Sequence, residues 1–270
     1  MINSKGNYLK SGGNMQHKFS RTELLIGPSG QEKLQQSSVM IFGIGGVGSF
    51  TVEALARAGI GHLILVDFDD ICLTNINRQL HALHSTVGEA KVEVMKRRIQ
   101  EINPSAKVEA FKEFYSVTDA DRFLDRNLSY VVDAIDTVSS KVSLAKECLL
   151  RGIPFISSMG AGNRLTAENY RVADLSKTSG DPLAKAMRKL LRKEGITKGV
   201  KVVFSPDLPL TPFTSDANCT TNCICPSGDA PCAVKRQIPG SISFVPSVVG
   251  LLIAGEVIRD LLNNSTTAQV

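Results

Sequence analysis

A glycine-rich turn near residue 45 most constrains the fold of this 270-residue chain. Val39 to Phe42 is a short apolar run, and the sequence Gly43-Ile44-Gly45-Gly46-Val47-Gly48 follows it directly. From Gly46 to Ala58 apolar side chains recur at helical spacing, and His62 to Asp67 is a second apolar run that ends in a carboxylate. A strand, a glycine turn, a helix and a second strand form a β-α-β unit with a right-handed crossover. The sequence therefore predicts a Rossmann-like core.

Strands and helices continue to alternate along the chain. Strands are expected at 107–111, 130–135, 155–158, 170–174 and 200–204, and helices at 88–102, 138–150, 181–194 and 245–262. This alternation predicts an α/β fold with a doubly wound, mainly parallel sheet and helices on both faces. A basic helix and a cysteine loop are inserted in its second half.

The domain organisation is expected to be simple. Residues 1–16 are rich in Gly, Asn, Ser and Lys, which predicts a flexible tail. Residues 17–270 are interpreted as a single domain, with a nucleotide-binding half at about 37–160 and a substrate-binding half at about 161–270.

The composition points to a cytoplasmic enzyme with no integral membrane segment. No signal-peptide pattern opens the chain. The most apolar stretch, Ile242 to Leu262, contains Glu256, Arg259 and Asp260, so its apolar run is too short to span a bilayer. The formal charge of +5 favours polyanionic partners only weakly.

The glycine turn and Asp67 together predict nucleotide binding. Glycine allows the main chain to approach a phosphate, and a helix N-terminus supplies N–H donors. Asp67 ends the second strand, where an acidic side chain can hold ribose hydroxyls. The alternative explanation for the glycines is close packing of strand against helix. On these residues alone, a nicotinamide dehydrogenase is the leading interpretation.

Three later segments argue against hydride transfer. They are Asn75-Ile76-Asn77-Arg78-Gln79, Val87-Gly88-Glu89-Ala90-Lys91 and Asp133-Ala134-Ile135-Asp136. All three should gather at the carboxyl ends of the strands, where ligands bind in such sheets. Cations and carboxylates there suit triphosphate chemistry, because charge builds on the α-phosphate and on the leaving pyrophosphate.

Each of these residues also has a structural explanation. Arg78 could form a surface salt bridge, Lys91 could be an ordinary helix-face lysine, and Asp136 could cap the helix that starts at Val138. Their combination, in this order along the chain, favours an ATP site over the three separate explanations.

The combined motifs resemble the adenylation domain of ubiquitin-activating enzymes, molybdopterin-synthase adenylyltransferase and the thiamine-pathway adenylyltransferase. The resemblance covers roughly residues 19–162 and implies ATP with Mg²⁺, a homodimer, and attack of a substrate carboxylate on the α-phosphate. It implies that Asp67 binds ribose, that Asn75, Arg78 and Lys91 hold the triphosphate, and that Asp136 holds magnesium. Phe19-Ser20-Arg21 matches an arginine that reaches the partner subunit's ATP, so Arg21 is expected to act in trans.

The resemblance thus implies four catalytic residues, Arg21, Arg78, Lys91 and Asp136. The expected nucleotide-binding set is Gly43, Gly45, Gly46, Gly48, Asp67, Asp69, Asn75, Arg78, Gln79, Lys91 and Asp136.

The second half resembles one branch of that family, the tRNA threonylcarbamoyladenosine dehydratases. The segments that carry this resemblance are 174–178, 181–185 with Arg188, 21–27 and 75–81. The branch implies ATP-dependent cyclisation of N6-threonylcarbamoyladenosine in tRNA through a carboxyl-adenylate, with release of AMP and pyrophosphate. No nucleophilic side chain is then required, because ring closure is intramolecular.

A basic helix independently favours an RNA substrate. Its cations recur at spacings of three and four, which gathers them on one side of a helix. The residues expected to contact tRNA are Lys177, Lys185, Arg188, Lys189, Arg192 and Lys193. The alternative is a solvated helix face without a partner.

Four of the six cysteines cluster as Cys219-x3-Cys223-x-Cys225-x6-Cys232. Four thiolates can close a tetrahedral Zn²⁺ site, but unligated cysteines and a redox-active or sulfur-accepting thiol remain alternatives. Cys72 and Cys148 are expected to be inert.

A second hypothesis is adenylation of the C-terminal glycine of a ubiquitin-like sulfur carrier, with a cysteine desulfurase or sulfur-acceptor system as partner. Sulfur-carrier adenylyltransferases usually have two CxxC pairs, and this chain departs from that spacing. A non-catalytic nucleotide-binding scaffold is a third hypothesis, which the full set of Arg78, Lys91 and Asp136 disfavours.

Overall fold

The computed structural model describes residues 16–213 and 239–263. The predicted tail therefore lies almost wholly outside the described residues. The four clustered cysteines, Cys219, Cys223, Cys225 and Cys232, also lie outside them, so the structure does not test their proposed zinc site.

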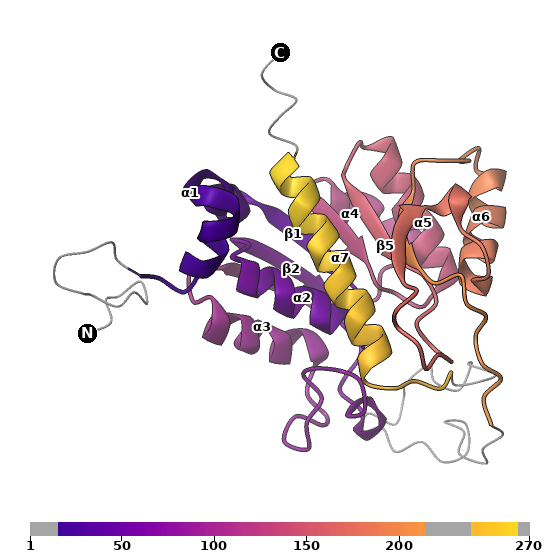
Figure 1. Ribbon diagram of the computed structural model, residues 1–270, viewed down its shortest axis with the longest axis horizontal. Coiled ribbons are helices and arrows are strands. Elements are labelled where there is room, and N and C mark those ends of the chain that lie inside the picture. The colour runs from indigo at the N-terminus through magenta and orange to yellow at the C-terminus, as the bar shows by residue number, and fades with distance from the viewer. Residues whose placement is uncertain (1–15, 214–238, 264–270) are drawn as a thin grey trace.

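A seven-stranded sheet forms the centre of the molecule, in the order β3-β2-β1-β4-β5-β7-β6 (Figure 1). The strands are β1 Ser38–Phe42, β2 His62–Val66, β3 Lys107–Phe111, β4 Tyr130–Asp133, β5 Phe155–Ser158, β6 Arg171–Asp174 and β7 Lys201–Phe204. Every neighbouring pair is parallel except β6 and β7. The strand order reverses between β1 and β4, and this reversal is where doubly wound sheets bind ligands.

Helices cover both faces of the sheet. They are α1 Ser20–Gln36, α2 Gly48–Ala58, α3 Lys91–Ile102, α4 Ala120–Leu124, α5 Val138–Leu150, α6 Pro182–Lys193 and α7 Phe244–Asn263, with 3₁₀ turns η1 Leu73–Asn75, η2 Val117–Asp119 and η3 Leu175–Lys177. Figure 1 shows α2, α3 and α7 on the near face, with α4 and α5 behind the sheet.

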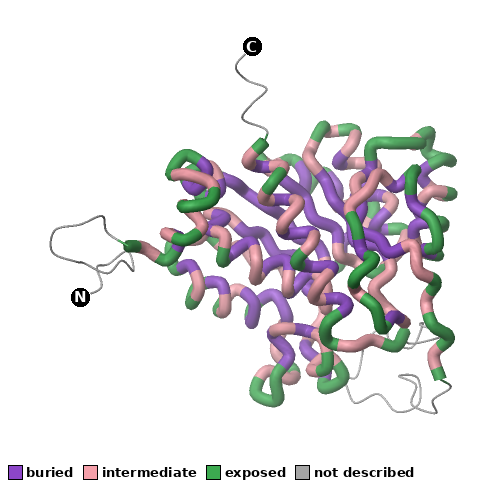
Figure 2. The backbone as a smooth tube through the Cα atoms, in the orientation of Figure 1, coloured by how far each residue is buried: buried purple, intermediate pink, exposed green. Residues whose placement is uncertain are grey.

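Alternating strand residues build two separate apolar cores. Val39 and Ile41 of β1 pack in the core with α2, α3 and α7, whereas Met40 and Phe42 pack in the core with α4, α5 and α6. Successive strand side chains point to opposite faces, so one strand serves both cores. Figure 2 shows the buried backbone concentrated along the central strands. The predicted α/β fold is confirmed.

The last helix packs one face onto the sheet and α2, with Val249, Ile253 and Val257 fully buried, while Leu251 on its other side is 50% exposed. Gly250 lets α7 lie close to α2, because a Cβ at this position would come 2.4 Å from the carbonyl oxygen of Val47. No helix within residues 16–213 or 239–263 is long and apolar enough to cross a bilayer.

Two details of the predicted elements were wrong. The helix expected at 88–102 begins at Lys91, because Gly88 takes a positive φ of 91° and donates its N–H to the carbonyl of Ile71. Helix α1 was not predicted, since Gly27 and Pro28 break its pattern; Gly27 has a φ of 73°.

One asparagine joins three segments that are distant in sequence. Asn163 follows β5 with a φ of 56°, in the left-handed region that asparagine tolerates better than most residues. Its N–H donates to Gly240, its side-chain oxygen accepts from the N–H of Gly240 at 2.6 Å, and its carbonyl accepts from the N–H of Leu210. The chain thus leaves this point at Leu210 and returns to it at Gly240.

Candidate active site

The glycine turn combines two roles. A Cβ at Gly43 would lie 2.6 Å from the carbonyl oxygen of Ala134, and one at Gly48 would lie 1.8 Å from that of Gly43. At Gly45, by contrast, a Cβ would meet only the side-chain nitrogen of Gln79, 3.8 Å away. Close packing therefore explains Gly43 and Gly48. Gly46 packs against α7, since a Cβ there would lie 3.2 Å from Pro246 Cβ, so Gly45, which is partly exposed, is the glycine that leaves the main chain open to a ligand.

Asp67 joins the end of β2 to the glycine turn. One of its carboxylate oxygens accepts the N–H of Ile44 at 2.6 Å, and the other accepts the N–H of Asp69 at 2.9 Å. Burial raises the pKa of Asp67, against the opposing effect of the Lys91 ammonium and of these N–H donors. The carboxylate thus fixes the turn at the end of β2 where a ribose is expected.

Lys91 is not an ordinary helix-face lysine. It is the first residue of α3 and is only 4% exposed. Its ammonium lies 2.6 Å from Asp69 Oδ2 and 3.9 Å from Asp67 Oδ1. Burial alone would lower the pKa of Lys91, but the two carboxylates outweigh it and raise the pKa. The raised pKa favours the charged ammonium, which the two carboxylates fix at the edge of the site.

Arg78 and Gln79 approach the glycine turn from the segment after β2. A Cβ at Gly46 would lie 3.5 Å from Arg78 Cγ. The Arg78 guanidinium donates to the carbonyl of Thr74 and to the side chain of Asn77, and no acidic partner is recorded within the described ranges. Within residues 16–213 and 239–263, the surface salt bridge considered from the sequence is therefore not formed, and no carboxylate compensates the guanidinium charge.

Asn75 acts partly as a structural residue in this segment. Its side-chain oxygen accepts the N–H of Cys72 at 3.1 Å, and its carbonyl accepts the N–H groups of Arg78 and Gln79. The buried side-chain oxygen of Gln79 has no hydrogen-bond partner in the described part of the chain. A buried polar atom without a partner beside an open main-chain turn fits a site that a polar ligand or water completes.

A fully buried ion pair holds the turn after β4. Lys141 Nζ lies 2.8 Å from Asp133 Oδ2, and both side chains are 0% exposed. Lys141 also donates to the carbonyl of Ile135 at 3.2 Å, and Asp133 accepts the N–H of Ile135 and the hydroxyl of Ser157. The peptide directly before Asp136 is therefore fixed by charged side chains that are not themselves accessible.

Asp136 is exposed at the same edge of the sheet. The N-cap of α5 is Thr137, and no side-chain cap hydrogen bond forms there, so Asp136 is not the N-cap that the structural alternative required. Within residues 16–213 and 239–263, no group of three His, Cys, Asp or Glu side chains could hold a metal ion by itself. A cation at Asp136 would thus need further oxygens from a bound ligand.

Two aromatic side chains beside Asp67 were missed in the sequence. Phe68 follows Asp67 directly and is 38% exposed, and Phe114 follows β3 and is 46% exposed. Their rings contact edge to face, with centroids 5.2 Å apart. Exposed aromatic side chains next to Asp67, where a ribose is expected, suit a purine. The sequence did contain one indication of these two residues, because each phenylalanine stands just after a predicted strand.

His81 is a second residue whose role was not predicted. It is 2% exposed, and neither ring nitrogen has a hydrogen-bond partner among the described residues. Burial, with a smaller effect of the Lys91 charge, lowers the pKa of His81 to about 3. The imidazole is therefore neutral at physiological pH and adds no charge beside Lys91.

Arg21 does not join this group within one chain. It is exposed near the start of α1, and Phe19, two residues earlier, packs beside Gly59, which precedes the amino end of β2: a Cβ at Gly59 would lie 3.2 Å from the Phe19 ring. Asp67, Arg78, Lys91 and Asp136 lie at the opposite, carboxyl edge of the sheet.

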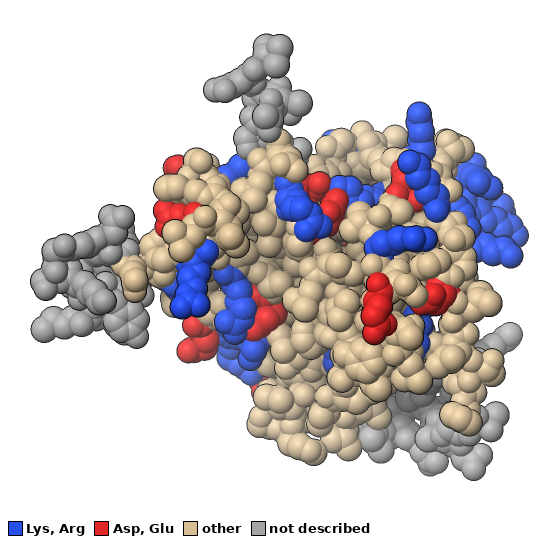
Figure 3. All heavy atoms as spheres, in the orientation of Figure 1, with Lys and Arg blue, Asp and Glu red and all other residues tan. Residues whose placement is uncertain are grey.

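The basic residues of α6 are on the surface, except for one. Lys185, Lys189, Arg192 and Lys193 are exposed, as is Lys177 at the end of η3, and Arg188 is half-buried and donates to the carbonyl of Leu175 and the hydroxyl of Thr178. No ion pair involving these six residues is recorded in the described part of the chain. Figure 3 shows Lys and Arg side chains gathered at the edge of the molecule where α6 lies.

Comparisons with known proteins agree with this geometry. A tRNA threonylcarbamoyladenosine dehydratase of Bacillus subtilis is 50% identical over 93% of this chain and 96% of its own length. Crystal structures of Escherichia coli tRNA N6-threonylcarbamoyladenosine dehydratase, TcdA, in complex with ATP and with AMP match with a TM-score of 0.81 and 33% identity. They cover 93% of this chain and 96% of theirs.

The sulfur-transfer branch is more distant. Adenylyltransferase and sulfurtransferase MOCS3 of Culex quinquefasciatus is 35% identical over 57% of this chain and 36% of that protein. The model of the ThiF family matches residues 19–270, which include the glycine turn, the carboxyl-edge residues and α6. The chain belongs to the ThiF family.

Proposed function

We propose that this chain catalyses the ATP-dependent dehydration of N6-threonylcarbamoyladenosine in tRNA. The observation that carries the proposal is the grouping, at one edge of the sheet, of an open glycine turn, two cations and two carboxylates. Asp67 contacts Ile44 of the turn, Lys91 contacts Asp67 and Asp69, and Arg78 lies against Gly46. This set fits a nucleoside triphosphate better than a nicotinamide cofactor, because hydride transfer needs neither a phosphate clamp nor a metal carboxylate.

ATP would bind across the carboxyl ends of β1, β2 and β4. Asp67 would accept hydrogen bonds from the ribose hydroxyls, and Phe68 would present an exposed face to the adenine. The main-chain N–H groups at Gly45 and Gly46, at the start of α2, would face the phosphates.

Arg78 and Lys91 would stabilise the charge that develops on the phosphates. Both side chains are anchored before substrate arrives, Arg78 by Thr74 and Asn77 and Lys91 by Asp69. Pre-organised cations cost little reorganisation in the transition state, and losing one such group typically costs about 10²- to 10³-fold in rate. Asp136 would hold Mg²⁺, which neutralises phosphate charge when bound; Asp69 offers a second carboxylate at the same edge.

The chemistry then needs only correct placement of the reactants. The threonine carboxylate attacks the α-phosphate of ATP, pyrophosphate leaves, and an acyl-adenylate forms. The carbamoyl group of the same nucleoside attacks the acyl carbon, AMP leaves, and a ring closes with the net loss of water. Because the second step is intramolecular, positioning supplies much of the rate.

The site is completed by a second subunit in this proposal. Arg21 lies at the edge opposite the ATP site of its own chain, so it can serve an ATP site only across a dimer. Leu24 and Leu25, on the same helix, are 86% and 87% exposed, and burial of such side chains favours association. We therefore propose a homodimer in which Arg21 reaches the partner's triphosphate.

The uncompensated cations of α6 fit a phosphate backbone. Because the proposed substrate is tRNA, we place the reaction in the cytoplasm.

A cysteine desulfurase or sulfur-acceptor partner is not required by this chemistry, since no sulfur is transferred. Adenylation of a sulfur carrier remains the alternative, but the α6 cations favour RNA.

Mass spectrometry of nucleosides tests the proposal. Transfer RNA that contains threonylcarbamoyladenosine is incubated with the protein and magnesium-ATP, and the expected product is lighter by one water and forms together with AMP and pyrophosphate. An unchanged nucleoside, combined with pyrophosphate exchange that depends on a sulfur-carrier protein, would contradict the tRNA assignment and leave the ATP site in place.

A further inference from the structure

Asn77 lies in the chain between two residues of the expected nucleotide site, Asn75 and Arg78. It is exposed, and both ends of its side-chain amide are engaged. Its Oδ1 accepts a hydrogen bond from Arg78 Nη1 at 2.8 Å, and its Nδ2 donates to the carbonyl of Ser241 at 2.9 Å. A guanidinium group has no acceptor, so this pairing also determines which end of the amide is the oxygen.

The hydrogen bonds of the Arg78 head group fall on a single nitrogen. Arg78 Nη1 donates to the carbonyl of Thr74 at 2.9 Å and to Asn77 Oδ1, and both acceptors are neutral. For Nε and Nη2, no hydrogen bond is recorded among residues 16–213 and 239–263. The guanidinium is thus held at one corner, and its opposite edge keeps the two parallel donors that match phosphate oxygens.

The other contact of Asn77 belongs to the second half of the chain. Ser241 follows Gly240, and Gly240 exchanges two hydrogen bonds with Asn163, one with the side-chain oxygen at 2.6 Å and one with the main-chain N–H at 2.7 Å. Asn163 lies just beyond the carboxyl end of β5. Asn77 therefore connects Arg78 to a segment that is itself fixed at the end of another strand.

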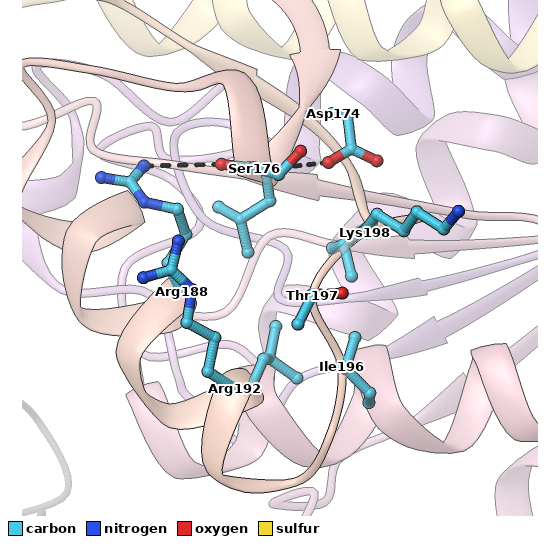
Figure 4. Close-up of a pocket in the computed structure, with 10 residues that line it drawn as sticks. Asp174, Ser176, Arg188, Arg192, Ile196, Thr197 and Lys198 are labelled. Carbon is cyan, nitrogen blue, oxygen red and sulfur yellow. Dashed lines mark hydrogen bonds between the residues drawn. The ribbon is translucent and has the colours of Figure 1, made fainter.

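A second arginine shows that neutral acceptors alone do not define a phosphate site. Figure 4 shows Arg188 on α6, where its guanidinium donates to the carbonyl of Leu175. Leu175 belongs to η3, so this contact ties η3 to α6. Arg78 differs in its location, because a Cβ at Gly46 would lie 3.5 Å from Arg78 Cγ. Its head group is therefore oriented beside the glycine turn, where the triphosphate is expected.

We propose that Asn77 is a positioning residue, which orients the Arg78 guanidinium from the segment 240–241 so that Nε and Nη2 face the triphosphate. Without Asn77, the head group keeps its contact with Thr74 but turns about its last side-chain bonds. Its charge stays near the phosphates, whereas the alignment of its donors in the transition state is lost. The rate of adenylation should then fall with little change in ATP affinity. This inference rests on the proposed function.

A double-mutant cycle tests the inference. Asn77→Ala, Arg78→Ala and the double variant are compared with the wild type in single-turnover release of pyrophosphate, with saturating tRNA that contains threonylcarbamoyladenosine. Varying ATP gives the maximal rate and the half-saturating ATP concentration. The matched control, Asn169→Ala, removes another exposed asparagine whose side chain is hydrogen-bonded, in its case to Asp207. Urea denaturation shows whether each variant folds like the wild type.

Asn77→Ala should lower the maximal rate about ten-fold and change the half-saturating ATP concentration less than about three-fold. In the Arg78→Ala background, the same substitution should change the rate less than about two-fold, because Asn77 acts only through Arg78. Asn77→Asp keeps an oxygen for Arg78 but has no donor for Ser241, so its rate should stay below that of the wild type. The Asn169→Ala control should match the wild type.

Three results would overturn the inference. The first is a near-normal rate in Asn77→Ala while Arg78→Ala is impaired. The second is a further ten-fold loss when Asn77→Ala is added to Arg78→Ala, since that would make Asn77 an independent structural residue. The third is a wild-type rate in Asn77→Asp, which would exclude the contact with Ser241.

Failure of the proposed function gives a different result. The wild type would then release no pyrophosphate with the modified tRNA, whatever residue stands at position 77. A wild type that is active and an Arg78→Ala variant that is equally active would instead reject the inference alone, because Asn77 would have no catalytic group to orient.

Discussion

Replacement of Lys141 by methionine should destabilise the protein strongly. Lys141 and Asp133 form an ion pair 2.8 Å long in which both side chains are fully buried. Methionine fills similar volume but leaves the Asp133 carboxylate buried with only Ser157 and the N–H of Ile135 as partners. Removing one member of a buried pair typically costs about 3 to 5 kcal/mol. The free energy of unfolding should fall by that amount.

The double variant Asp133→Asn/Lys141→Met separates charge from packing. Asparagine can still accept from Ile135 and contact Ser157, and it leaves no buried charge. We expect the double variant to lie within about 2 kcal/mol of the wild type, since a buried pair replaced by neutral residues is often tolerated. Urea denaturation followed by circular dichroism at neutral pH measures both variants. A single variant as stable as the double variant would refute the argument that buried charge sets the cost.

Four further predictions concern the candidate site. Arg78→Ala should lower kcat by about 10²- to 10³-fold with little change in unfolding free energy; near-normal turnover would remove Arg78 from the site. Inactive Arg21→Ala and Asp136→Ala subunits should regain part of the activity when mixed, whereas no recovery after proven subunit exchange would argue for sites built within one chain. Phe68→Ala should raise KM for ATP several-fold with kcat nearly unchanged, which initial-rate kinetics would show. His81 has a folded-state pKa of about 3, below the unfolded value of 6.5. Its contribution to stability is therefore complete above pH 6.5 and falls by up to roughly 1.4 kcal/mol per pH unit below it. The His81→Asn variant should show a shallower loss of stability between pH 6.5 and 4.5 in the same denaturation assay.

The sequence was most informative where local patterns and topology agree. The apolar run before Gly43 and the position of Asp67 after the next run predicted the β-α-β unit, and the ends of most helices and strands were within two residues. Because parallel strands place their carboxyl ends at one edge, the sequence also predicted which residues would meet there. The structure brings Asp67, Lys91 and Arg78 to that edge as expected.

Other features depend on contacts that spacing does not reveal. In the sequence, Lys141 looks like an ordinary lysine on the face of a helix. In the structure it is fully buried, because its ammonium forms an ion pair with Asp133 at the end of β4. The glycines of the turn look equivalent, but Gly43 and Gly48 satisfy packing and Gly45 leaves open space. Helix α1 was missed because its glycine and proline interrupt the apolar pattern.

The hydrogen bonds of Asn163 have a consequence for how the family could diversify. Leu210 and Gly240 are tied to the same residue, so the chain between them begins and ends at one fixed point. Changing the length of a loop between fixed ends alters its closure cost by only about 0.6 kcal/mol per doubling. Insertions, deletions or exchange of this segment should therefore leave the sheet intact. The number of residues between Leu210 and Gly240 can therefore differ between relatives while the residues at the carboxyl edge of the sheet keep their positions.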